Sequence, residues 1–262
     1  MFKYGKRRAL FDFYDLCRAR IFKTKSIIQW HSYQRYIVSN QLCREYGITN
    51  IKPFNFRGWH EGTCTFTGKM NNEKVFIKRS IYKESIDAEK TNIEYLHASG
   101  SEAFFHTAEV YGSTRIRNEY YVVESFIEGK PLSNLLHSLD AEALSSILLR
   151  LYKIVVFFNG INFIHCDLTP KNVLLSGEKL FLIDFEYSTT ISSIPTNRRL
   201  LSLSKRMLKQ LGGEYALGNG ILDDSFSLVQ VVKLHCPDFI NKHYDKWTEI
   251  NLNVLKFCYN KE

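Results

Sequence analysis

Three residues with oxygen-bearing side chains stand at fixed spacing in one short segment, and this spacing constrains the chain more than any other feature. The segment covers residues 165–186 and reads HCDLTPKNVLLSGEKLFLIDFE. Asp167 is followed five residues later by Asn172, and Asp184 comes directly after the apolar run LFLI. Taken singly, the three residues also suit a loop cap, a turn and a strand end. Their joint spacing between a capped helix and two short strands favours a shared chemical role.

The rest of the chain divides into strand-like and helix-like runs, with no internal repeat and no low-complexity tract. Alternating apolar residues predict strands, while apolar residues three or four apart predict helices. An N-terminal extension over about 8–46 has helical spacing. Predicted strands then cover 54–62, 63–70, 74–80, 108–112, 119–126, 173–175 and 180–183, and predicted helices cover 84–99, 141–158 and the region from about 196. This order predicts an α+β fold.

The segment and its setting resemble the protein-kinase superfamily over about residues 54–186. The resemblance implies an enzyme that transfers a phosphoryl group from ATP to an alcohol, with Mg²⁺. Asp167 stands in the place of the catalytic base, while Asn172 and Asp184 stand where kinases hold the metal. The implied architecture is a two-lobed kinase-like fold, with a β-rich lobe over 51–126 and a reduced helical lobe over 127–262. The basic amphipathic helical extension over 1–50 precedes these lobes and is not covered by the resemblance.

The resemblance also implies a lysine that contacts the phosphates of ATP. Lys78 ends the strand VFIK and occupies that place. Its expected partner on the following helix is Glu89 or Glu94. Glu89 is favoured, because Ile93 and Leu96 then share one packing face with it.

Further nucleotide contacts are expected from a loop and from a strand end. Gly58 and Gly62 suit a turn over the phosphates, since residues without Cβ let backbone N–H groups approach anionic oxygens; a simple hairpin is the alternative. The run YYVVESFIEGKPL resembles a hinge, which implies that the backbone from Glu124 to Phe126 meets adenine. Lys171, four residues after the catalytic-type Asp, is expected to reach the γ-phosphate.

Two departures distinguish the chain from typical protein kinases. Thr169 replaces the usual lysine, and Glu186 replaces the glycine of the Asp-Phe-Gly motif. No Ala-Pro-Glu motif occurs in the 76 residues that follow Glu186. The combination is similar to the bacterial lipopolysaccharide kinases of the Kdo and heptose group, whose helix pattern is matched here by Glu89, Ile93, Leu96 and Gly100.

That second resemblance implies a lipid-linked glycan as acceptor. Three other functions share parts of the pattern: a protein Ser/Thr kinase, a small-molecule phosphotransferase of the aminoglycoside or choline type, and a pseudokinase scaffold without turnover. The presence of Lys78, Asp167, Asn172 and Asp184 argues against the scaffold, which would not need all four.

Charge and cysteine content suggest where the chain works. Its net charge is +8, and residues 1–25 hold eight Lys and Arg against two Asp. Such a segment suits binding to an anionic membrane surface, where each Lys or Arg contributes about 1 kcal/mol to the binding free energy. The alternative is a helix that packs on the core of the protein and exposes its basic face to solvent. No nucleic-acid recognition motif accompanies the basic charge. We expect no signal peptide, no membrane span and no zinc or disulfide framework, hence a cytoplasmic protein, peripheral on the inner membrane face.

Overall fold

A computed structural model describes residues 24, 28, 30, 35–55, 63–196, 224, 227, 233, 237–245 and 248 of the 262-residue chain. The chain divides into two compact units. The first comprises Met1–Ile86 and Glu109–Phe126, and the second comprises Asp87–Ala108 and Ile127–Glu262. The predicted α+β class, with an antiparallel sheet and few helices, is confirmed. The domain boundaries stay predictions.

The first unit is built on a five-stranded antiparallel sheet with the strand order β1-β2-β3-β5-β4. These strands run over Thr49–Asn55, Thr63–Met70, Glu73–Ser80, Glu119–Ser125 and Val110–Ile116, in that spatial order. Strand β1 begins before the predicted start at residue 54 and contains Pro53. It is an edge strand, where a residue without an N–H is tolerated, and its pairing with β2 is irregular at two places.

The β2–β3 hairpin follows from its turn. Asn71 and Asn72 both have positive φ, 51° and 66°, as a two-residue turn that matches the twist of a hairpin requires. Asn tolerates this conformation better than most residues because its short polar side chain bonds locally. The pairing Met70↔Glu73 continues without interruption to Thr63↔Ser80. The predicted turn is confirmed.

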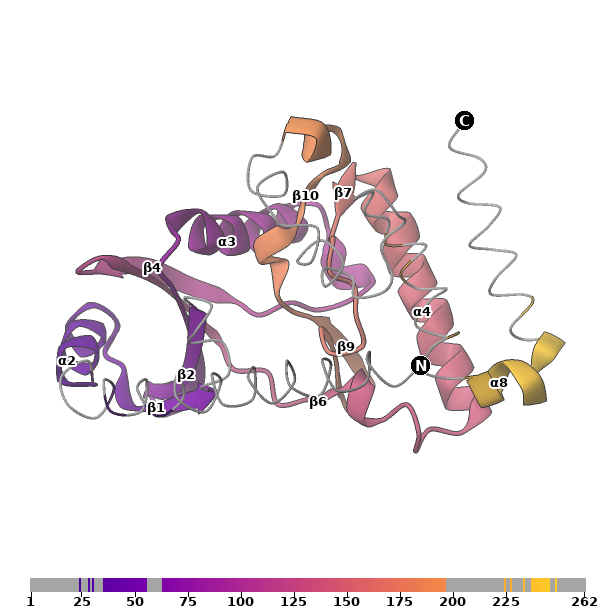
Figure 1. The fold of residues 1–262 in the computed structure, drawn as a ribbon, viewed down its shortest axis with the longest axis horizontal. Helices are drawn as coiled ribbons and strands as arrows, with labels where there is room; N and C mark the ends of the chain where they lie inside the picture. The colour runs from indigo at the N-terminus through magenta and orange to yellow at the C-terminus, as the bar shows by residue number, and fades with distance from the viewer. Residues whose placement is uncertain are drawn as a thin grey trace, which may run out of the picture. The chain divides into compact units, whose positions relative to one another are not determined.

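One face of this sheet is covered by helix α2, which spans Arg35–Tyr46 (Figure 1). The shared core contains the buried residues Trp30, Val38, Leu42, Ile48, Ile51, Cys64, Phe66, Val75, Ile77, Ile116, Tyr121 and Val123. Two glycines make room for this layer. A Cβ at Gly68 would lie 2.5 Å from Ile48 Cγ2, and one at Gly112 would lie 2.7 Å from the Tyr46 ring. Within the predicted 1–50 extension, helix α2 is therefore packed on the sheet, while residues 1–23 lie outside the described residues.

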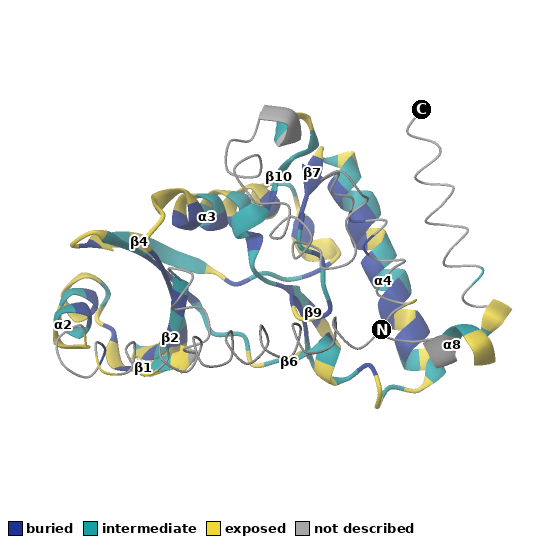
Figure 2. Ribbon diagram, viewed as in Figure 1, coloured by how far each residue is buried: buried dark blue, intermediate teal, exposed yellow. Residues whose placement is uncertain are grey.

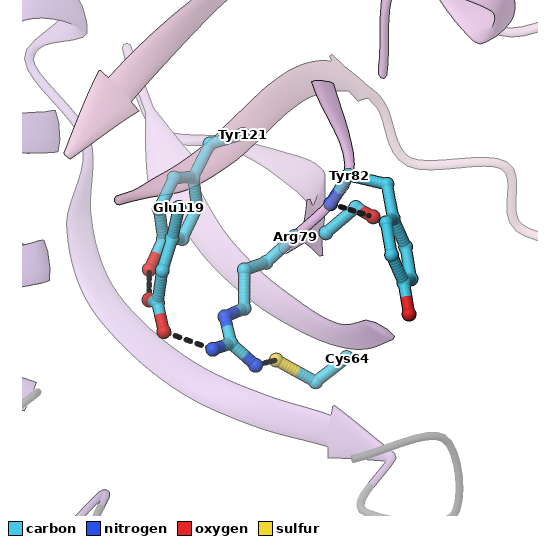
Figure 3. A network of polar contacts seen from close by, with 6 residues as sticks. Cys64, Arg79, Tyr82, Glu119 and Tyr121 are labelled. Carbon is cyan, nitrogen blue, oxygen red and sulfur yellow. Dashed lines mark hydrogen bonds and ion pairs between the residues drawn. The ribbon is translucent and has the colours of Figure 1, made fainter. Parts of the chain in front are cut away.

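A polar network is enclosed in the same layer (Figure 3). The Arg79 guanidinium lies between two partners, donating to the Glu119 carboxylate and, at 3.6 Å, to Cys64 Sγ. Tyr121 Oη donates to the second oxygen of Glu119 at 2.8 Å. Burial raises the pKa of Cys64 to about 12, so this thiol stays protonated at neutral pH. Each of these four side chains has a polar partner within the network, and a buried charge requires such partners.

Two helices dominate the described part of the second unit. Helix α3 spans Lys83–Ala98, its first four residues belonging to the first unit, and α4 spans Ala141–Gly160. Asp140 caps α4, since its Oδ1 accepts the amide of Ala143 at 2.8 Å. One side of α4 is buried along its length (Figure 2), at Leu144, Ile147, Leu148, Leu151, Ile154, Val155 and Phe158. Both helices confirm the predicted segments.

The remaining elements of the second unit are short. Strands β6 (Lys130–Pro131), β8 (Val173–Ser176) and β9 (Lys179–Leu182) form one sheet in the order β6-β8-β9, and β7 (Phe163–Ile164) pairs with β10 (Thr189–Thr190). Short 3-10 turns lie at Ser101–Ala103, Leu132–Asn134, Phe185–Tyr187 and Ile191–Thr196, and a helix, α8, at Pro237–Lys242. None of the described helices is long and apolar enough to cross a bilayer.

Candidate active site

The β8–β9 hairpin sets two of the predicted site residues next to each other. Asn172 precedes β8 and Asp184 follows β9 by two residues, and the pairing Val173↔Leu182 closes the open end of the hairpin. Beyond that pair, Ile183 N donates to Asn172 O at 3.0 Å. The backbone of Asp184 is thereby held beside Asn172. Asn172 and Asp184 are therefore close in space although they are separated in the sequence, because they lie at the open end of the same hairpin.

Asp167 joins Asn172 through side-chain contacts. Asn172 Nδ2 donates to Asp167 Oδ2 at 2.8 Å and to Asp167 O at 2.9 Å. Both N–H groups of the amide are used in this way, so its Oδ1 is directed away from Asp167. Asn172 is buried and Asp167 is half-buried. The structure therefore brings Asp167, Asn172 and Asp184 together, while their catalytic roles stay predictions.

Two residues of this site have left-handed backbone conformations. Cys166 has φ 66°, and Asp184 has φ 70° and ψ 59°. Such conformations cost about 1–3 kcal/mol for a residue with a side chain and persist only where the surroundings enforce them. Strained residues of this kind concentrate at functional sites.

Asp224 is the residue that enforces the conformation at Cys166, and sequence reasoning missed it. Its Oδ2 accepts the amide of His165 at 2.8 Å, and its Oδ1 accepts the amide of Cys166 at 3.2 Å. Asp224 is buried. Burial, together with the charges of Asp224 and Asp167, raises the pKa of the Cys166 thiol well above its ordinary value. The only local signal was a pair of acidic residues within a helical pattern, which normally indicates an exposed face.

His165 connects the loop to the strand that ends at Asp184. Its Nδ1 accepts the amide of Asp167 at 3.3 Å, and its Nε2 lies 3.2 Å from Ile183 O. An acceptor at Nδ1 and a donor at Nε2 define the neutral tautomer with the proton on Nε2. The ring is fully buried and packs 4.8 Å from the Phe185 ring.

Of the two glutamates considered as partners of Lys78, one is buried and the other is solvated. Glu89 is 2% exposed, and its Oε1 accepts the amide of Phe185 at 3.2 Å. Glu94 is exposed and pairs with Lys90 at 3.8 Å within α3. Which of the two pairs with Lys78 stays a prediction. Lys78 itself is buried on β3, opposite Thr65 and Val122.

At the end of β5, the segment predicted to contact adenine has one backbone N–H group that is already hydrogen-bonded within the protein. Glu124 lies in β5 with its side chain buried, opposite Phe76 and Val110. Phe126 N donates to Lys74 O at 3.3 Å, and Lys74 Nζ lies 3.5 Å from the centroid of the Phe126 ring. A nucleotide base that took this amide as donor would have to displace that backbone bond.

The roles of three further predicted residues stay predictions. Gly58 and Gly62 lie outside the described residues, so the phosphate loop stays a prediction. Lys171 is exposed, next to the buried Asn172.

The donor atoms gathered here fit a magnesium ion. Asp184 supplies carboxylate oxygens and Asn172 an amide oxygen, and Mg²⁺ prefers such hard oxygen ligands and keeps several waters besides. Among the described residues there is no group of three or more His, Cys, Asp or Glu side chains that could hold a metal.

Together the fold and the arrangement of the site residues define a class, the proteins with a protein-kinase-like fold. The particular family follows from comparison with known proteins, because residues 70–203 match the RIO domain. This match covers half of the chain, and the chain therefore belongs to the RIO domain family. The predicted likeness to kinases is confirmed at the level of the superfamily. The likeness to the Kdo and heptose kinases stays a prediction.

A second comparison is with a protein kinase. The chain is 25% identical over 181 residues to the mitosis inhibitor protein kinase SWE1 of Candida albicans. The aligned region covers 59% of this chain and 15% of SWE1, so the chain spans only a small part of the length of that relative. The predicted assignment to ATP-dependent kinases is in line with both comparisons.

Proposed function

We propose that this chain transfers the γ-phosphoryl group of ATP to a hydroxyl group of an acceptor, with Asp167 as the catalytic base. The observation that carries the proposal is the Asn172–Asp167 contact of 2.8 Å beside the strained Asp184. Phosphoryl transfer needs a carboxylate at the acceptor hydroxyl and oxygen ligands for a metal at the phosphates. These three residues offer that set within one loop and one hairpin.

Each of the site residues would have a separate role in the transfer. Asp167 accepts the proton of the acceptor hydroxyl as its oxygen attacks the γ-phosphorus. Asn172 orients the Asp167 carboxylate and, with Asp184, would hold Mg²⁺, which when bound offsets negative charge on the phosphate oxygens. Lys78 would bind the phosphates, with Glu89 as the proposed partner of its ammonium group. Lys171 would contact the γ-phosphate from the loop.

For the acceptor, we propose a sugar hydroxyl of a lipid-linked glycan, such as the Kdo or heptose of a lipopolysaccharide core. Support comes from the sequence resemblance and from Glu186, which stands where protein kinases have a flexible glycine. Residues 1–25 would bring the enzyme to such an acceptor by binding the anionic inner face of the cytoplasmic membrane.

A protein hydroxyl is the second candidate. The RIO domain family and SWE1, whose name describes a protein kinase, support this alternative. The two acceptors can be separated by incubating the chain with labelled ATP and either core glycolipid or a mixture of proteins. Label found only in protein would exclude the glycan; label found only in glycolipid would exclude the protein.

The proposed base is tested by Asp167→Asn, which keeps the volume and leaves an oxygen to accept from Asn172. We expect turnover to fall by roughly 10²- to 10⁴-fold, the usual contribution of a general base. The Kd for ATP with Mg²⁺ should change less than a few-fold. Asp140→Asn is the matched control, because Asn also caps a helix and α4 should stay intact. If Asp167→Asn retains turnover within a few-fold of the unaltered chain, Asp167 is not the base.

A further inference from the structure

Asn92 makes two side-chain contacts that none of the functions above requires. It lies on α3, one turn after Glu89, so both side chains are on the same side of the helix. Its Nδ2 donates to Phe185 O at 2.9 Å and to Ser188 O at 2.8 Å. The two N–H groups of one amide thus join the carbonyls at either end of the turn that follows Asp184.

The same turn is held by three other bonds, all within the second unit. Glu89 accepts the amide of Phe185, and Ser188 N donates to Phe185 O at 3.1 Å. The Ser188 hydroxyl donates to His165 O at 3.0 Å. The turn over 185–188 is therefore tied to α3 on one side and to the catalytic-type loop on the other.

These hydrogen bonds restrict the backbone conformation of Asp184. On its N-terminal side, Ile183 is bonded to Asn172 and His165. On its C-terminal side, the next peptide is bonded through its N–H to Glu89, and the Phe185 carbonyl to Asn92. An unfavourable left-handed conformation persists only where its neighbours are fixed in this way. Asn92 supplies two of the bonds on the C-terminal side.

We propose that Asn92 is a positioning residue, which fixes the turn after Asp184 and so presents the Asp184 carboxylate to a divalent cation. This inference rests on the proposed function. An asparagine suits the place, because its amide offers two donors on a short, stiff stem. Aspartate has the same shape but offers no donor when ionised, and it would face two carbonyl oxygens with negative charge.

The test uses the full chain with Asn92→Asp, with Asn92→Ala in case the first variant does not fold. Asn134→Asp is the matched control, since Asn134 is exposed and its Oδ1 accepts a hydrogen bond from the Ser133 hydroxyl. Binding of Mn²⁺ in the presence of a non-hydrolysable ATP analogue is followed by the electron paramagnetic resonance signal of the free ion. Hydrogen exchange of the Phe185 and Ser188 amides and the Mg²⁺ dependence of ATP turnover are measured on the same proteins.

We expect the Asn92 variants to need roughly 10- to 100-fold more metal for half-saturation, the usual loss when a partner of a metal ligand is removed. Exchange of the Phe185 and Ser188 amides should become faster, and the Asn134 variant should match the unaltered chain. Unchanged Mn²⁺ affinity in a folded Asn92 variant overturns the proposal. If the unaltered chain binds Mn²⁺ but does not turn over ATP, the proposed function fails while Mn²⁺ binding still tests Asn92. If it binds no Mn²⁺, both fail.

Discussion

Replacing Asp224 by Asn should damage the site without touching any of its reacting groups. Asp224 accepts two backbone amides, at 2.8 Å and 3.2 Å, one through each carboxylate oxygen. Asparagine has a single side-chain oxygen, so one of the two amides would face an NH₂ group instead of an acceptor. The amide that loses its acceptor belongs to His165 or to Cys166.

The expected cost follows from these two bonds. A hydrogen bond to a charged acceptor contributes about 1.5–3 kcal/mol, and the second bond weakens when the charge is lost. Cys166 would also be released from a conformation that is unfavourable by about 1–3 kcal/mol, so the loop should rearrange. We therefore expect the free energy of the native loop to rise by about 2–4 kcal/mol. If the whole cost falls on the loop, turnover drops by roughly 30- to 800-fold.

Urea unfolding and ATP turnover, measured on the same preparation, show whether the substitution destabilises the whole protein or rearranges only the loop. Global destabilisation lowers the urea midpoint, while local rearrangement lowers turnover at an unchanged midpoint. Asp140→Asn is again the control, because that carboxylate is exposed and caps a helix. A stability within about 0.5 kcal/mol of the unaltered chain, together with turnover within twofold, would refute the assigned role of Asp224.

The polar network of the first unit supports two further predictions. Because burial raises the pKa of Cys64 from 9.0 to about 12, the native thiol keeps a proton that the unfolded thiol releases; stability should therefore fall as pH rises from 9 towards 12. Urea unfolding under reducing conditions should show a smaller alkaline loss in Cys64→Ala, and an equal loss would contradict the assignment. Arg79→Met should destabilise the chain by about 1–3 kcal/mol, because the half-buried Glu119 carboxylate loses its guanidinium partner while Tyr121 still donates to it. Adding Glu119→Gln should recover at least 1 kcal/mol in a double-mutant cycle, and strict additivity would exclude their coupling.

Elements with strong local signals could be predicted from the sequence. The Asn71-Asn72 turn, the cap at Asp140 and the apolar side of α4 each depend on neighbours within a few residues, so local rules suffice. Strand β1 could not be placed in the same way. Its Pro53 and its two irregular pairings with β2 hide the alternation that indicates a strand, and only the edge position makes them acceptable.

The candidate site shows the same division. Asp167, Asn172 and Asp184 could be found because a loop and a hairpin join them over a short stretch of chain. Asp224 could not be found, because its contact with His165 spans 59 residues and depends on how the second unit folds. Asn92 was missed for a related reason. A polar residue on a helix usually faces solvent, and no local pattern shows that two carbonyl groups of a distant turn lie opposite it.

The irregular edge strand has a consequence for the handling of this protein. A strand at the border of a sheet offers unpaired backbone groups to other chains, and proline or a bulge interferes with such pairing. Removing residues 1–62 would delete β1 and leave β2, whose pairing with β3 is regular over its whole length, as the new border. A shortened chain of that kind should self-associate through intermolecular sheets.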